Sequence, residues 1–282
     1  MQVDEDMDLT LDGMPSASAN PYPGLRPFLP HEEHLFFGRD LQVDGMIAKL
    51  ERTRFLAVVG TSGSGKSSLV NCGLRPALSR GRMVSAGPAW CFAPFRPGNR
   101  PIRALAQALA DALKLPAPDV GRFSAADFVE NTLRSSPLGL IDVCAEAGLP
   151  PGTQLLVIVD QFEELFRYRA LAARPDAPAD ADGDPATAFV NLLLEARAQD
   201  APIHIVLTMR SDFLGDCARF AGLPEAINQG QYLVPRMSRD ERRAAIAGPA
   251  RVCGADIAPT LLAMMGLPQP AEMTGRSLIQ FQ

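Results

Sequence analysis

Residues 55–70 read FLAVVGTSGSGKSSLV, and this stretch decides the fold class. Its first five residues are apolar and are followed by Gly60, a pattern that predicts a short buried strand. The eight residues from Gly60 to Ser67 match G-x-x-x-x-G-K-[ST] at every defined position. The residues that follow, 66–78, are predicted to be helical. A strand, a glycine-rich loop and a helix in this order predict a phosphate-binding loop (P-loop).

This loop contains the residue types that phosphate binding requires. Glycines permit tight turns and a close approach of backbone N–H groups to phosphate oxygens, and the next helix points the positive end of its dipole at the anion. We expect Lys66 to bring its charge to the β- and γ-phosphates and the Ser67 hydroxyl to bind Mg²⁺. The predicted nucleotide-binding positions are Gly60, Thr61, Ser62, Gly63, Ser64, Gly65, Lys66, Ser67 and Ser68.

Outward from this loop, short apolar segments alternate with segments of helical periodicity. Further strands are predicted over 90–95, 155–159 and 203–209, and helices over 40–52, 101–113, 124–133 and 188–198. Apolar strands separated by amphipathic helices are typical of parallel sheets. The chain is therefore predicted to be an α/β protein, a P-loop NTPase with a doubly wound parallel sheet and flanking helices.

Acidic residues follow the strand predicted over 155–159. Ligands of open α/β sheets bind at the carboxyl ends of the strands, so we expect Asp160 to hold Mg²⁺ directly or through water. Glu163 and Glu164 come soon after, and one of them is predicted to orient the water that attacks the γ-phosphate. Asp160 could also cap a helix formed by DQFEELF (residues 160–166), a role that is compatible with metal binding.

A basic residue, Arg210, follows the strand predicted over 203–209. A cation at this strand end faces the position of the γ-phosphate and can stabilise its charge. The equally weighted alternative is a surface arginine paired with Asp212.

Composition restricts the partners. Hydrophobic residues make up 47% and charged residues 21% of the 282 residues, as in globular proteins. The net charge of −5 equals that of residues 1–20, which hold five acidic and no basic residues and are predicted to be disordered. The remainder is neutral, so nothing indicates nucleic-acid binding. The chain has no apolar run long enough for a membrane helix, and its five cysteines are widely spaced, which favours a cytoplasmic protein.

Six segments of the chain together resemble one family, the novel STAND NTPase 1 family. These segments are NPYPGLRPF (20–28), FFGR (36–39), VVGTSGSGKSSLV (58–70), VIVDQFEELF (157–166), LTMRSDFLGDC (207–217) and AIAGPA (245–250). STAND proteins are signal-transduction P-loop ATPases with numerous domains. The resemblance extends over residues 20–254 and implies an ATP-driven, slowly hydrolysing switch of a signalling or defence protein rather than a metabolic enzyme.

The resemblance also implies roles for particular residues. It places Phe37, Gly38 and Arg39 near the nucleotide base, and it makes Arg210 the residue that senses the γ-phosphate. Gly248-Pro249-Ala250 resembles a remnant of the lid motif that reaches the adenine, with Pro249 as its contact. ATP or ADP and Mg²⁺ are the implied ligands, and self-association or a signalling protein is the implied partnership.

The end of the chain departs from the STAND pattern. Residues 255–278 resemble the C-terminal tail of cofactor-independent phosphoglycerate mutase, but they bring neither a nucleophile nor a metal cluster, so mutase activity is not implied. We expect a P-loop domain over 21–254, with a flexible loop over 170–187 and a truncated lid, followed by a short helical tail over 255–282. A gene fusion, a frameshift or an artefact of gene prediction would each produce such a join, and a chance helix–turn is the alternative.

Two other functions remain open at this point. A truncated, non-hydrolysing nucleotide-binding or interaction module would follow from the missing lid, with self-association through the apolar face that the lid would cover. A small-molecule kinase also uses this loop, although the chain shows no evident acceptor site. A GTPase is disfavoured because the chain contains no N-K-x-D motif.

Overall fold

The computed structural model describes residues 21–24, 26–116, 123–172 and 184–252, together with positions 262 and 268. The disordered segment predicted over 1–20 and nearly all of the tail predicted over 255–282 lie outside the described residues. The chain divides into two compact units. The sheet unit comprises Pro27–Glu33 and Arg39–Arg236, and the terminal unit comprises the chain up to Arg26, His34–Gly38 and the chain from Met237 onward.

The sheet unit is built on five parallel strands in the order β2-β3-β4-β1-β5. The strands are β1 (Phe55–Gly60), β2 (Trp90–Phe95), β3 (Gln154–Val159), β4 (Ile203–Arg210) and β5 (Gln231–Leu233). Strands β1, β3 and β4 lie in the middle and are buried almost throughout, which explains why their sequences are mostly apolar. The predicted doubly wound parallel sheet is therefore confirmed.

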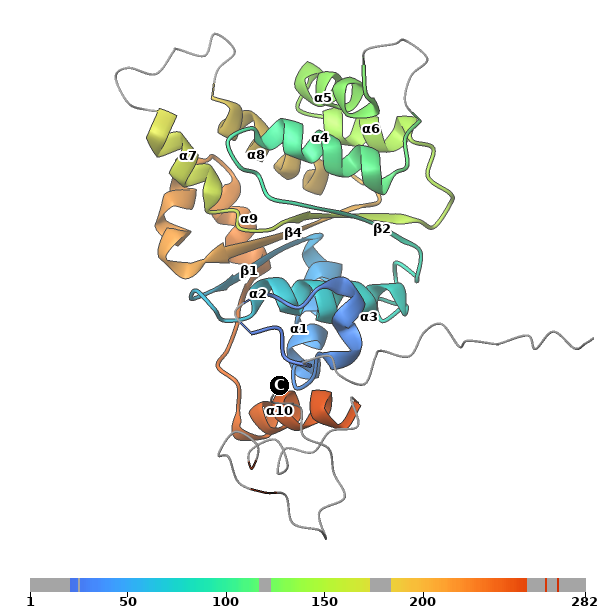
Figure 1. Cartoon of the computed structure of the whole chain (residues 1–282). Helices are drawn as coiled ribbons and strands as arrows, with labels where there is room; N and C mark the ends of the chain where they lie inside the picture. Colours follow the sequence, from blue (N-terminus) through green and yellow to red (C-terminus); the bar gives the residue numbers. More distant parts are fainter. Residues whose placement is uncertain are drawn as a thin grey trace, which may run out of the picture. The chain divides into compact units, whose positions relative to one another are not determined.

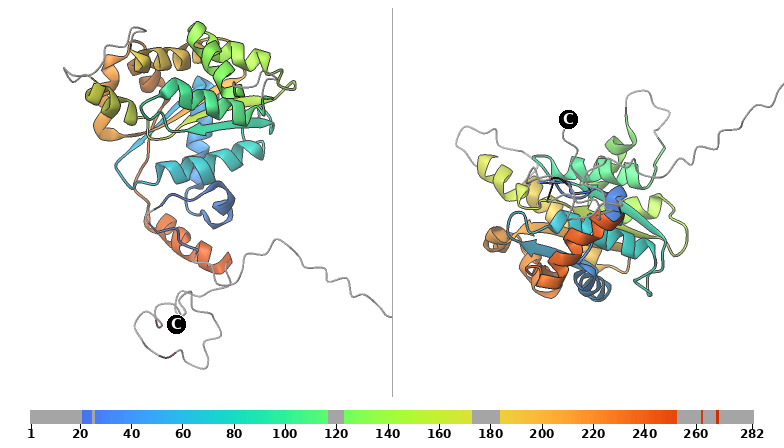
Figure 2. Two further views of the ribbon diagram at one scale, coloured as in Figure 1. Left: turned by 45° about the horizontal axis from the view of Figure 1, so that its top comes forward. Right: turned by 60° about the horizontal axis from the view of Figure 1, so that its bottom comes forward.

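Helices cover both faces of this sheet, with α4, α5, α6 and α8 on one face and α1, α2 and α3 on the other (Figures 1 and 2). Their bounds are α1 (Asp40–Thr53), α2 (Lys66–Ser68), α3 (Arg75–Ser79), α4 (Pro101–Ala112), α5 (Ala125–Ser135), α6 (Gly139–Glu146), α7 (Glu164–Ala172), α8 (Pro185–Ala198) and α9 (Leu223–Gly230). A π-helix, η2 (Leu69–Leu74), joins α2 to α3, and two 3₁₀ helices are η1 (Pro30–Leu35) and η3 (Ser211–Arg219). Among the residues that the structure describes, no helix has the length and apolarity of a membrane span.

The terminal unit contains α10 (Arg239–Val252). Pro249 lies inside this helix, where it can donate no backbone hydrogen bond. The Tyr22 hydroxyl donates to the Ile246 carbonyl at 2.6 Å, so residues from the two ends of the chain meet within this unit.

The elements predicted from the sequence agree with the structure, except in one segment. All four predicted strands are present, and Ser124 forms the expected capping box with Asp127 at the start of α5. The flexible loop predicted over 170–187 is wrong at both ends. Helix α7 continues to Ala172, and α8 begins at Pro185 because the Asp184 side chain caps it by accepting from the Ala186 N–H at 3.3 Å. Residues 173–183 lie outside the described part.

One core residue makes stability depend on pH. His204 in β4 is only 6% exposed, its ring contacts that of Trp90 at 5.0 Å, and its Nδ1 has no hydrogen-bond partner in the described structure. Burial, assisted by the charge of Arg54, lowers the pKa of His204 from 6.5 to about 4. Between pH 6.5 and pH 4, His204 is therefore protonated in the unfolded chain but stays largely neutral in the folded chain.

We expect His204 to destabilise the fold as the pH falls from 6.5 towards 4, by about 2 kcal/mol at pH 5. A His204→Leu variant lacks this titration, so its free energy of unfolding should fall less between pH 7.5 and pH 5 than that of the wild type. Chemical denaturation of both proteins at the two pH values measures the difference. Equal losses of stability on acidification would contradict this assignment.

Candidate nucleotide-binding site

The P-loop follows β1 at the carboxyl edge of the sheet and folds tightly over the strand end. A Cβ atom at Gly60 would lie 2.7 Å from the Ser64 Oγ, so any larger residue would displace this hydroxyl. Gly63 and Gly65 have φ angles of +72° and +82°, in the region that favours glycine. The Ser64 hydroxyl is buried without a hydrogen-bond partner among the described residues, as expected for a group that awaits a ligand.

Lys66 opens α2 and turns back over the loop. Its Nζ donates to the carbonyls of Gly60 at 3.0 Å and Thr61 at 2.8 Å. Partial burial lowers the pKa of Lys66, and the carboxylates of Glu163 and Asp160 oppose this shift. The amine is thus bound by neutral carbonyls in these contacts, and its charge is available to an anion in the loop.

Asp160 lies directly after β3 and is linked to the P-loop. Its Oδ1 accepts hydrogen bonds from the hydroxyls of Ser67 and Thr208, each at 2.6 Å. Its Oδ2 lies 3.5 Å from the Nε of Arg96. Helix α7 begins only at Glu164, so the prediction that Asp160 also caps this helix is wrong.

The turn after Asp160 separates the two glutamates. Gln161 has a φ of +57°, and its N–H donates to the Thr208 Oγ1 at 3.0 Å, which fixes the turn against β4. Glu163 is 6% exposed, and its Oε2 has no hydrogen-bond partner in the described structure. Glu164 instead accepts a hydrogen bond from the Gly98 N–H at 3.1 Å. Glu163 thus has a buried acceptor without a partner in the described structure, and its charge acts on Lys66.

Arg210 forms an ion pair with Asp212, with its Nε 3.3 Å from Oδ1, and its guanidinium lies 5.6 Å from the centre of the Phe213 ring. This pairing raises the pKa of Arg210 and lowers that of Asp212. The Asp212 pair that the sequence suggested is therefore present at the strand end.

The donor set suits Mg²⁺. Two hydroxyls and one carboxylate (Ser67, Thr208 and Asp160) gather at one point, and Mg²⁺ prefers one or two carboxylates completed by phosphate oxygens and waters. The described residues contain no group of three histidines, cysteines or acids that would hold a metal without such help. A pocket of about 200 Å³ adjoins this point and is lined in part by Asn71 and Arg96.

The other predicted positions are distributed between the units. In the terminal unit, a Cβ at Gly248 would lie 2.4 Å from the Phe37 ring, and one at Gly38 would lie 2.4 Å from the Glu241 carbonyl, so residues 37–38 pack against α10 near Pro249. Two further positions belong to the sheet unit. Arg39 is buried and donates to the Pro235 carbonyl at 3.0 Å, and the Ser68 hydroxyl accepts from the Phe28 N–H at 3.0 Å.

Two residues at the site were not predicted from the sequence, namely Thr208 and Arg96. Val159 pairs with Phe95 on one side and with Leu207 on the other, so positions 96 and 208 necessarily flank position 160. The signal that could have identified them is the strand order, which places β3 between β2 and β4.

Comparisons with known proteins extend this description. A sequence model of the novel STAND NTPase 1 family matches residues 21–275, and thus extends beyond the boundary predicted at residue 254. The chain is also 82% identical over 27 residues to the 2,3-bisphosphoglycerate-independent phosphoglycerate mutase of Chromobacterium violaceum, covering 10% of this chain and 5% of that protein. The mutase of Ruthia magnifica is 51% identical over 49 residues, covering 17% and 10%. The chain thus spans a tenth or less of the length of these curated relatives.

The solved structures that match this chain are distant in sequence. The Aeropyrum pernix ORC2 protein, in ADPNP-ADP complexes, has a TM-score of 0.49 and 13% identity, with 76% of this chain and 52% of that chain covered. The HORMA:CdnC:Trip13 complex of E. coli MS115-1 gives a TM-score of 0.46 and 15% identity, with coverage of 90% and 82%.

Proposed function

The chain belongs to the novel STAND NTPase 1 family, and from this premise we propose that it binds ATP with Mg²⁺ in the P-loop and hydrolyses it slowly as a molecular switch. The observation that carries this proposal is the hydrogen bond between Ser67 of the P-loop and Asp160 at the end of β3. This bond brings the P-loop, which would bind the phosphates, next to the carboxylate that would bind Mg²⁺.

The residues of the sheet unit would have distinct roles in binding and hydrolysing ATP. The backbone N–H groups of the loop and the Lys66 amine bind the β- and γ-phosphates. Ser67 and Asp160 hold Mg²⁺, which when bound neutralises charge on the phosphate oxygens. Glu163 orients the attacking water and accepts its proton, because its buried Oε2 has no other hydrogen-bond partner in the described structure. Arg210 exchanges Asp212 for the γ-phosphate once ATP is present.

We also propose that Phe37, Gly38, Arg39 and Pro249 recognise the adenine, the role that the resemblance to this family implies for them. We further propose a cytoplasmic signalling or defence role, in which ATP and ADP states differ in self-association or in binding a partner protein.

Titration of the purified chain with ATP and ADP, with and without Mg²⁺, tests the binding step. Saturable binding that Mg²⁺ strengthens supports the proposal, and its absence would contradict it. Phosphate release well above that of an inactive P-loop variant separates a hydrolysing switch from a non-hydrolysing module. Transfer of labelled phosphate to a metabolite instead of water would identify a kinase.

The ion pair between Arg210 and Asp212 makes a separate prediction. An Asp212→Asn variant releases the guanidinium, so we expect ATP to bind about two- to fivefold more tightly relative to ADP, the range that an exposed ion pair supports. Competition binding with both nucleotides measures the ratio. An Asp216→Asn variant, which removes the carboxylate paired with Arg219 in the same 3₁₀ helix, is the matched control. If the ratio of ATP affinity to ADP affinity were the same in the two variants, the proposal that Arg210 senses the γ-phosphate would be wrong.

A further inference from the structure

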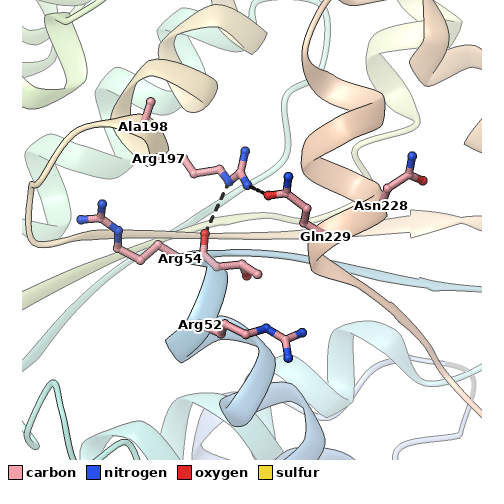
Figure 3. A pocket seen from close by; sticks show the side chains of 7 residues that line it. Arg52, Arg54, Arg197, Ala198, Asn228 and Gln229 are labelled. Atoms are coloured by element: carbon pink, nitrogen blue, oxygen red, sulfur yellow. Dashed lines mark hydrogen bonds between the residues drawn. The ribbon is translucent and has the colours of Figure 1, made fainter.

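A second polar pocket lies in the sheet unit, at the opposite edge of the sheet from the P-loop. Its volume is about 660 Å³, and its lining residues are Arg52, Thr53, Arg54, Arg197, Ala198, Asn228 and Gln229 (Figure 3). Arg54 directly precedes β1, whereas the P-loop follows the other end of this strand. We call this site the arginine pocket. The proposed ATPase mechanism uses none of its residues.

The arginine pocket carries three guanidinium groups and no acidic lining residue. Arg54 lies 3.6 Å from Asp200 and donates to the Ala201 carbonyl at 3.1 Å. The Asp200 side chain is fully exposed, so this ion pair is screened by solvent and compensates little of the charge. In Figure 3 the side chains of Arg52 and Arg54 extend in different directions.

Hydrogen bonds hold Arg197 and Gln229 in place and leave some of their N–H groups free to donate to a ligand. The Arg197 Nε donates to the Thr53 carbonyl at 3.4 Å, and its guanidinium also donates to the Oε1 of Gln229 (Figure 3). Since the Gln229 carbonyl faces a group that can only donate, the Gln229 amide nitrogen is left as a donor. The contact of Arg197 with the Phe55 ring, at 5.9 Å from its centre, further fixes the guanidinium.

Arg52 supplies further free donors. It is exposed in the last turn of α1, and within the described residues it makes no hydrogen bond or ion pair. The pocket wall thus combines Arg52 and Arg197 with the amides of Asn228 and Gln229, all of which can donate to an oxygen-rich anion. Guanidinium groups match the planar geometry of carboxylates and the oxygen pairs of phosphates.

We propose that the arginine pocket binds a small polyvalent oxyanion, a ligand with several phosphate or carboxylate groups. Such a ligand would neutralise the positive charge of the guanidinium groups that Asp200 does not neutralise. Its binding would be independent of the nucleotide in the P-loop.

Calorimetric titration of the full chain with inorganic pyrophosphate and, separately, with citrate tests the proposal. The Lys66→Ala variant is the background, so that the P-loop does not compete for the anion. We expect saturable binding, weakened about tenfold or more by Arg52→Gln. Binding of pyrophosphate alone identifies a phosphate ligand, binding of citrate alone identifies a carboxylate ligand, and binding of both identifies a general oxyanion site.

Arg134→Gln is the matched control, since Arg134 is a similarly exposed arginine on α5 that pairs with Glu130. Arg52 makes no contact that its loss would break within the described structure, so the variant should fold, and a second variant, Gln229→Leu, should weaken binding at least threefold through the lost amide. No saturable binding of either anion, or equal losses in Arg52→Gln and Arg134→Gln, would overturn the proposal.

Discussion

A Glu163→Gln variant is expected to hydrolyse ATP about 10²–10⁴-fold more slowly than the wild type, the range that loss of a general base produces. Glutamine preserves the size of the side chain and removes the carboxylate that accepts the proton. Because the Glu163 Oε2 has no hydrogen-bond partner in the described structure, the change should break no structural contact at this atom. ATP affinity should therefore stay close to that of the wild type.

Glu164→Gln is the matched control, because Glu164 accepts a hydrogen bond from Gly98 and lies outside the proposed reaction. Phosphate release under single-turnover conditions measures the chemical step for both variants, and equilibrium binding of ATP shows that their sites are intact. If Glu164→Gln lost as much activity as Glu163→Gln, or if Glu163→Gln retained it, the assignment of the base would be wrong.

Replacement of Lys66 by alanine is expected to have the second large effect, on binding. A hydrogen bond to a charged group contributes roughly 1.5–3 kcal/mol, so the Kd for ATP should rise about 10- to 150-fold. The amine contacts only loop carbonyls within the described structure, so the anion is the partner whose loss dominates.

Lys114→Ala provides the control for the general loss of a positive charge, because Lys114 is exposed beyond the end of α4. Calorimetry with a non-hydrolysable ATP analogue and Mg²⁺ gives the Kd of the wild type and both variants. Unchanged affinity in Lys66→Ala, with a folded protein, would place the nucleotide elsewhere.

The P-loop could be predicted from the sequence because the features that define its backbone are local. Positive φ angles at Gly63 and Gly65, the close approach at Gly60 and the helix that starts at Lys66 all depend on neighbours within eight residues. The buried strands were equally predictable, since strands covered on both faces are mostly apolar, although β4 also buries His204 and Thr208.

The surroundings of Asp160 depend on partners that are distant in sequence. Thr208 and Arg96 reach it because β3 lies between β4 and β2, and no local pattern encodes that order. The choice between Glu163 and Glu164 likewise needed the fold, since the turn that begins with the positive φ of Gln161 buries one glutamate and directs the other to Gly98. The three-residue strand β5 is too short to show a period.

The division of the chain into two units restricts how the protein can be shortened. The backbone passes between the units four times, after Arg26, Glu33, Gly38 and Arg236. A fragment that starts at Arg39 loses the Phe37 ring that packs on Gly248, and one that stops at Arg236 loses α10 itself. Any minimal version intended for binding measurements should therefore retain residues 21–38 and 237–252 together, because either segment alone leaves an apolar surface of the other without its cover.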